Sequence, residues 1–160
     1  MCSALLVAAL GLLIARAPEQ ASPDTDLAAD ADPSALDRIV VERRAALAVL
    51  PADADPLSRA KAEAMLADAE RTLAELDGAA GAAEEALRLY TSAGRLLRSM
   101  TEPRPDLLGH VELHRGEVLD LLGQTRESAS AFQAAQEAFA AAGLPVMAEV
   151  AEQRFSELTQ

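Results

Sequence analysis

Alanine is the feature that most restricts what this chain can fold into. It occupies 37 of the 160 positions, whereas only four residues are aromatic. Alanine, leucine, glutamate and arginine favour helices, and the β-branched and aromatic residues that suit strands are scarce. A β-sandwich or β-barrel is therefore disfavoured. We expect an all-α fold in which small side chains let the helix axes approach one another closely.

Proline, aspartate and glycine predict where the helices begin and end. Two helices should start where a capping aspartate precedes a proline in the first turn, at Asp32-Pro33 and at Asp55-Pro56. The first of them stops before Pro51 and the second stops at Gly78. Four more helices are predicted at 80–100, 106–122, 125–142 and 146–158.

Signals within these later segments set their boundaries. Gly94 is a weak point in the helix at 80–100, but the apolar register continues beyond it. Asp106 follows the breaker at 101–105 and is expected to cap the next helix. Gly123 and Gly143 should end the helices that precede them.

Apolar residues recur at spacings of three and four in each helix and should form the buried faces. Between residues 57 and 76 we expect Ala62, Met65, Leu66, Ala69, Leu73 and Leu76 to point inward. Farther along, Phe132 and Phe139 should be buried. The loops are short, so neighbouring helices should pair as antiparallel hairpins.

The stretch from Gly109 to Gly143 resembles a tetratricopeptide repeat, a helical hairpin with small residues where its helices cross. Gly116 stands at the small position of the first helix, and Gly123 stands at the turn. Other family positions carry Leu119, Ser128, Phe132 and Ala135.

The match also has departures. Glu112 stands where the family has tryptophan, and Arg115 stands where it has leucine. The usual terminal proline is displaced to Pro145. An upstream copy is weaker and aligns Gly78 with the turn. The resemblance implies a short α-solenoid of antiparallel hairpins, with an apolar helix and an acidic linker before it.

The first 33 residues divide into two segments. Residues 1–16 carry an apolar run that is too short to span a bilayer. It suits a buried helix or, alternatively, a signal segment, although no basic residues precede it. Residues 17–33 are acidic and rich in proline and alanine, which is typical of a linker. We assign residues 34–160 to the helical domain.

The sequence holds no recognisable catalytic motif, and Cys2, the single cysteine, has no neighbouring base. We therefore predict no enzyme, no cofactor and no metal. His110 and His114 lie four residues apart, close enough to share a metal ion, but a third ligand is not evident. Their order, H-V-E-L-H, also differs from H-E-x-x-H. A metal-dependent enzyme that uses these histidines is kept as an unfavoured alternative.

Charge limits the choice of partners. The formal net charge of −12 disfavours binding to nucleic acid. Between residues 86 and 105 the chain turns locally basic, and arginines can grip carboxylates in bidentate fashion. These arginines can instead neutralise acids of the same chain, as Arg88 can with Glu84.

The resemblance implies that proteins or peptides bind to a concave surface lined by the segments 57–76 and 106–122. The candidate contacts are Arg59, His114 and Arg115, with Arg95 and Arg98 at the rim.

Together these patterns favour a non-catalytic scaffold for protein–protein interaction that binds a peptide or a partner helix. We expect it in the cytoplasm, without a membrane span. An array this short can also self-associate through an open end. The excess of arginine over lysine indicates a bacterial source, in which such repeats occur in regulators. The alternative is an exported or envelope-associated assembly factor, if residues 1–17 are a signal segment.

Overall fold

A computed structural model describes residues 33–159 of the chain. These residues form six α-helices and no strand, which confirms the expected all-α class. The helices are α1 (Pro33–Ala48), α2 (Pro56–Asp77), α3 (Ala80–Ser99), α4 (Pro105–Leu121), α5 (Thr125–Ala141) and α6 (Pro145–Leu158). The two interpretations of residues 1–16, and the linker expected at 17–33 apart from Pro33, concern residues outside the described range.

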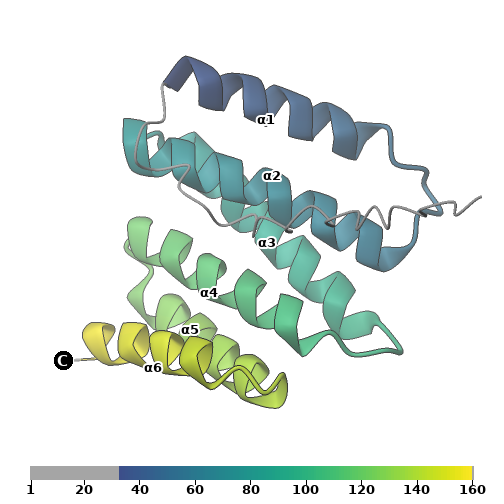
Figure 1. Cartoon of the computed structure of the whole chain (residues 1–160). Helices are drawn as coiled ribbons and strands as arrows, with labels where there is room; N and C mark the ends of the chain where they lie inside the picture. Colours follow the sequence, from purple (N-terminus) through teal and green to yellow (C-terminus); the bar gives the residue numbers. More distant parts are fainter. Residues whose placement is uncertain (1–32, 160) are drawn as a thin grey trace, which may run out of the picture.

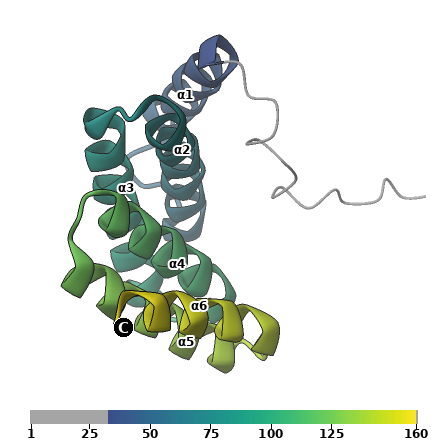
Figure 2. The same cartoon turned by 90° about the vertical axis from the view of Figure 1, so that its left-hand side faces the viewer.

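The helices pack against one another in the order of the chain. α2 pairs with α3 and α4 pairs with α5, while α1 rests on α2 and α6 rests on α5. In Figure 1, α2, α4 and α6 lie nearer the viewer, and α3 and α5 lie behind them. We call these two sets the front layer and the back layer. Figure 2, turned by a quarter, shows the progression from α1 to α6.

The predicted start and stop signals explain most helix boundaries. The Asp55 carboxylate accepts a hydrogen bond from the Ser58 backbone N–H at 2.9 Å, and Pro56 occupies the first turn of α2. The glycines expected to end helices have positive φ angles that favour residues without a Cβ atom. They are Gly78 at 64°, Gly123 at 70° and Gly143 at 71°.

One predicted cap is wrong. Asp106 does not cap α4, because Arg104 holds the N-cap position and Pro105 comes first in the helix. Asp106 lies in the first turn, where its carboxylate receives two hydrogen bonds from the Arg104 guanidinium, at 2.8 and 3.1 Å. A carboxylate there is also stabilised by the positive end of the helix dipole.

Two hydrophobic cores run through the stack. The larger is shared by α1 to α4 and contains Tyr90, which is fully buried among leucines and alanines. The smaller joins α4, α5 and α6 around Phe132 and Phe139. Of the residues expected inside α2, Met65 and Leu76 are instead 52% and 45% exposed. Four of the eight buried residues of α2 are alanines, so its buried face holds few large side chains.

Helices α4 and α5 approach each other closely because two glycines of α4 lie against two phenylalanine rings of α5. A Cβ atom added to Gly116 would lie 2.7 Å from Phe132, and one added to Gly109 would lie 2.6 Å from Phe139. The buried Ser128 hydroxyl donates a hydrogen bond to the Gly116 carbonyl at 2.8 Å. Only a residue without a side chain allows this approach.

We predict that Gly116→Ala lowers the free energy of unfolding by about 1–3 kcal/mol, because the added methyl overpacks the crossing. Chemical denaturation followed by circular dichroism measures the change. Gly81→Ala is the matched control, since a Cβ atom there meets nothing within 4 Å. It should leave stability unchanged or raise it. Equal effects of the two substitutions would contradict the close crossing.

Candidate functional site

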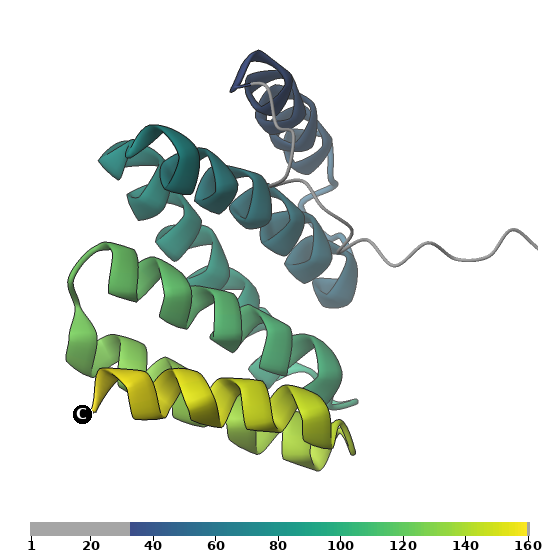
Figure 3. The same ribbon diagram turned by 60° about the vertical axis from the view of Figure 1, so that its left-hand side comes forward.

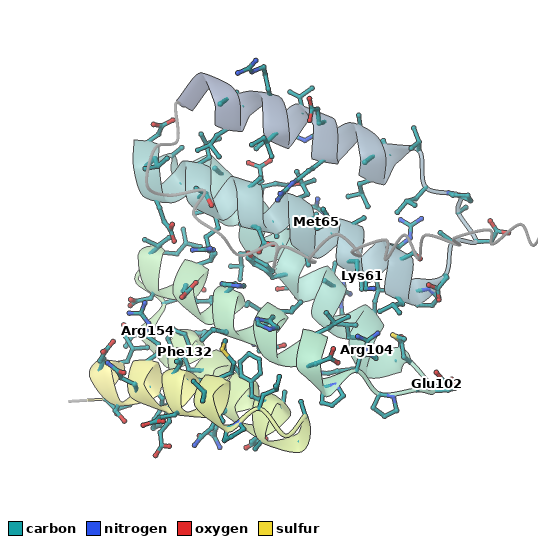
Figure 4. All side chains as sticks on the ribbon, viewed as in Figure 1. Lys61, Met65, Glu102, Arg104, Phe132 and Arg154 are labelled. Atoms are coloured by element: carbon teal, nitrogen blue, oxygen red, sulfur yellow. The ribbon has the colours of Figure 1, made fainter. Side chains whose placement is uncertain are left out.

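The front layer encloses a hollow of about 420 Å³ between α2, α4 and α6, with α5 behind it. We call this hollow the groove. Its lining combines two arginines and four carboxylates with apolar side chains. They are Arg71, Glu75, Glu117, Asp120, Leu121, Phe132, Arg154, Glu157 and Leu158. Figure 4 labels Phe132 and Arg154 between α4 and α6, and Figure 3 shows α4 and α6 running side by side.

Glu117 of α4 links the three helices of the front layer. Its carboxylate lies 3.4 Å from the Arg71 guanidinium of α2 and 3.9 Å from the Arg154 guanidinium of α6. On its own helix, the Nδ1 atom of His114 lies 2.9 Å from the same carboxylate. One side chain therefore holds together the walls of the groove.

A second polar contact joins α2 to α3 of the back layer. The hydroxyl of Tyr90 donates a hydrogen bond to the Asp68 carboxylate at 2.6 Å. The Tyr90 ring stacks on the ring of His114, with 6.1 Å between centroids. Arg71 also forms an ion pair with Glu75, one turn later on α2. Tyr90 of α3 thus connects α2 with α4 next to the Glu117 network.

The two histidines are held by aromatic packing. His110 stacks on His114 at 6.4 Å between centroids and meets the edge of Phe139 at 5.0 Å. Within residues 33–159 no three histidine, cysteine, aspartate or glutamate side chains gather into a possible metal site. The metal-enzyme alternative therefore gains no geometric support from the described part of the chain.

The arrangement favours the ionised form of Glu117. Burial alone would raise the pKa of Glu117, but the hydrogen bond from His114 and the charges of His114, Arg71 and Arg154 outweigh it. The pKa of Glu117 therefore lies below its ordinary value of 4.5. Both arginines of the lining are engaged with carboxylates, and carboxylates outnumber them. The groove as a whole is acidic.

Two of the predicted contact residues, Arg98 and Arg115, meet at a buried acid. Glu112 of α4 is 1% exposed and pairs with Arg98 of α3 and with Arg115, whose Nη2 atom is 2.7 Å away. A buried carboxylate needs such partners, because its desolvation is otherwise very costly. The two arginines therefore have an internal role between α3 and α4, although Arg98 remains half exposed.

The other predicted contacts lie apart. Arg59, near the start of α2, donates a hydrogen bond to the Pro51 carbonyl at 3.0 Å and ties the preceding loop to the helix. Arg95 is exposed on α3, on the side opposite its buried residues. Only His114 of the five candidates contacts the Glu117 network. The structure does not gather the five into one site.

Sequence reasoning missed Arg71, Glu117, Tyr90 and Arg154. Arg71 and Glu117 lie within the segments expected to line a surface, 57–76 and 106–122, which form α2 and α4. A signal was present, because Arg71 interrupts the upstream repeat at its small position. The pairing of Arg154 with Glu117 depends on how α6 folds back, which no local pattern reveals.

Comparisons with known proteins identify no family. No known protein family matches the chain, and neither does any curated protein. Among solved structures, the crystal structure of BtubC (BKLC) from P. vanneervenii matches with a TM-score of 0.55 at 20% sequence identity. The match covers 79% of this chain and 47% of that one, so the chain spans about half the length of BtubC. At this identity the likeness concerns the fold alone.

Among the helices between residues 33 and 159, none combines the length and the hydropathy that a membrane crossing needs.

We predict that Glu117→Gln lowers the free energy of unfolding by roughly 1–3 kcal/mol at neutral pH, because charge-assisted bonds are lost. A lowered pKa in the folded state stabilises the fold above the unfolded value near 4.5, and this contribution disappears as the pH falls through the folded value. Urea denaturation from pH 7 down to pH 3 should therefore show the two proteins converging in stability below about pH 4.5.

Comparing the wild type with Glu117→Gln isolates the contribution of Glu117, because the pKa values of other carboxyl groups also change on folding. Burial raises the pKa of Glu70, although the pairing with Arg44 opposes this. A raised pKa affects stability in the direction opposite to the lowered pKa of Glu117. A constant difference between wild type and Glu117→Gln across this pH range would contradict the network.

Tyr90 gives a second titration. Burial raises the pKa of Tyr90 well above its ordinary value of 10.0, and the Asp68 carboxylate raises it further, against the opposing effect of Arg71. Because Tyr90 is the only tyrosine, the near-ultraviolet absorbance of tyrosinate reports it alone. We predict that the native protein titrates above pH 10, the urea-unfolded chain near 10, and native Asp68→Asn between them. Identical midpoints in all three would refute the buried hydrogen bond.

Proposed function

We propose that this chain is a tetratricopeptide-like helical repeat protein whose groove binds a peptide or a helix of another protein, without catalysis. The alternation of front-layer and back-layer helices supports the repeat assignment, as does the crossing of Gly116, Ser128 and Phe132. A place among bacterial regulators, in the cytoplasm, is part of the same proposal.

The observation that carries the proposal is the network around Glu117. It joins three helices of the front layer around one hollow and leaves apolar side chains beside it. Leu121, in the wall of that hollow, is 52% exposed. An exposed leucine next to fixed charges is typical of a recognition surface, where apolar contact gives affinity and polar groups give orientation.

The charge of the groove selects the partner. Asp120 is exposed and forms no ion pair with another of residues 33–159, and Glu75 and Glu157 lie near it in the lining. A segment that places an apolar residue on Leu121 and a lysine or arginine beside Asp120 would complement this lining. Such a partner is basic, whereas a clamp made by Arg95 and Arg98 would select an acidic one.

The experiment places a photo-crosslinking amino acid at Leu121, in the groove, and at Thr91, which is exposed on α3 in the back layer. Both proteins are produced in the native host, irradiated and analysed by mass spectrometry. We expect a discrete protein to be captured from Leu121 and not from Thr91, through a segment that carries basic residues.

Binding of the captured segment is then measured by calorimetry with two charge-changing variants. Asp120→Lys should weaken binding by at least about tenfold, and the control Arg95→Glu should leave it unchanged. Capture from both positions alike, or loss of binding in Arg95→Glu alone, would refute the groove as the binding site.

A further inference from the structure

The groove lies at one edge of the molecule, where the three helices of the front layer end. Its lining includes Glu75 in the last turn of α2, Asp120 in the last turn of α4 and Glu157 in the last turn of α6. None of these three turns holds a basic residue. The C-terminal end of a helix carries a partial negative charge, so the three ends add to the negative potential of the carboxylates. The groove is therefore suited to a cation.

Two neighbouring side chains of this edge are open to a ligand. Asp120 is exposed and forms no ion pair with another of residues 33–159, whereas the other three carboxylates of the lining are paired. Leu121, next to it, is 52% exposed. A guanidinium beside apolar side chains would suit both positions, because the charge would meet Asp120 and the apolar groups would cover Leu121.

The chain holds a segment of this chemistry outside the described residues. Residues 1–16 contain one charged side chain, Arg16, and it directly follows the apolar residues 12–15. Residues 17–32 contain five acids and no base, so the acidic groove repels them. Arg16 is thus the cation nearest to α1 in the preceding sequence, and it is accompanied by the apolar groups that the groove requires.

The position of α1 brings this segment within reach of the groove. Figure 1 shows α1 beginning at the edge where α2, α4 and α6 end. α1 packs on α2, which forms one wall of the groove, and packed helices lie about 8–10 Å apart. The 16 residues between Arg16 and Pro33 can span up to about 55 Å. A short connection also gives a high effective concentration, on the order of millimolar.

We infer that the segment ending at Arg16 occupies the groove of its own chain, with the Arg16 guanidinium on Asp120 and the preceding apolar side chains over Leu121. This inference rests on the proposed function, because it uses the same groove, and it makes the segment a competitor of the partner. A partner binds only after displacing the segment. The apparent affinity for the partner is therefore reduced in proportion to the fraction of molecules whose groove is open.

An aromatic photo-crosslinking amino acid at Leu121 of the purified full chain tests this contact, with Thr91 of the back layer as the control position. After irradiation, peptide mapping by mass spectrometry should show position 121 joined to residues 4–16 and position 91 not joined to them. The product should keep the mass of a monomer, and its yield should not change on dilution, because the contact lies within one chain.

Charge reversal identifies the pair. With the crosslinker at position 121, Arg16→Glu and Asp120→Arg should each lower the yield about fivefold, because an attraction becomes a repulsion. The double variant restores opposite charges and should recover most of the original yield, whereas the control Arg95→Glu should leave it unchanged. Asp120 is exposed, so circular dichroism should show the same fold throughout. Equal yields from all variants, or a double variant no better than the single ones, would overturn the inference.

The result is separable from that of the proposed function. Capture of another protein from Leu121 in the host, without a crosslink to residues 4–16 in the purified chain, overturns the inference and leaves the function. The internal crosslink without capture of another protein does the reverse. A crosslinked dimer whose yield falls on dilution overturns the inference, since the segment then reaches a second copy. So does a mature protein that lacks residues 1–17, as a cleaved signal segment would leave it.

Discussion

The close approach of helices is the constraint on which the rest of this structure depends. A chain with four aromatic residues cannot fill wide gaps between helices, so its helices must lie near one another. Glycine and alanine allow this, and Phe132 and Phe139 lie directly on Gly116 and Gly109. Tyr90 belongs to the other core and is fully buried among leucines and alanines. Few large side chains suffice because the spaces between helices are small.

Close packing also explains where the charges lie. The tight contact of α3 with α4 leaves the Glu112 carboxylate buried, and Arg98 and Arg115 neutralise it from two helices. On the front layer the helices diverge enough to leave a hollow, and there Glu117 holds α2 and α6 to α4. One acid thus stabilises the interior between the layers, and the other shapes the surface that we propose as a binding site.

Local sequence signals predicted the fold better than the site. Proline after aspartate and glycine at positive φ depend only on neighbouring residues, so Pro56, Gly78 and Gly123 marked their boundaries correctly. Asp106 failed as a cap because Pro105 had already taken the first helical position. Met65 fitted the apolar spacing of a buried face, yet its side chain is 52% exposed on α2.

The site could not be read from the chain because its charges pair across helices. Arg98 was identified as a basic residue free to bind, but its partner Glu112 lies on the next helix. Glu117 and Arg154 are far apart in sequence and meet only when α6 returns to the front layer. Spacing along one helix predicts contacts within that helix, such as His114 with Glu117, and predicts nothing about a third helix.

The most direct test of the close crossing is the proton NMR spectrum of the folded protein. If Gly116 and Gly109 lie beneath the phenylalanine rings, the shielding by those rings should move their α-proton resonances strongly upfield, and nuclear Overhauser contacts should join Gly116 to Phe132 and Gly109 to Phe139. Glycine resonances at their ordinary positions, without contacts to either ring, would contradict the account of how these helices are held together.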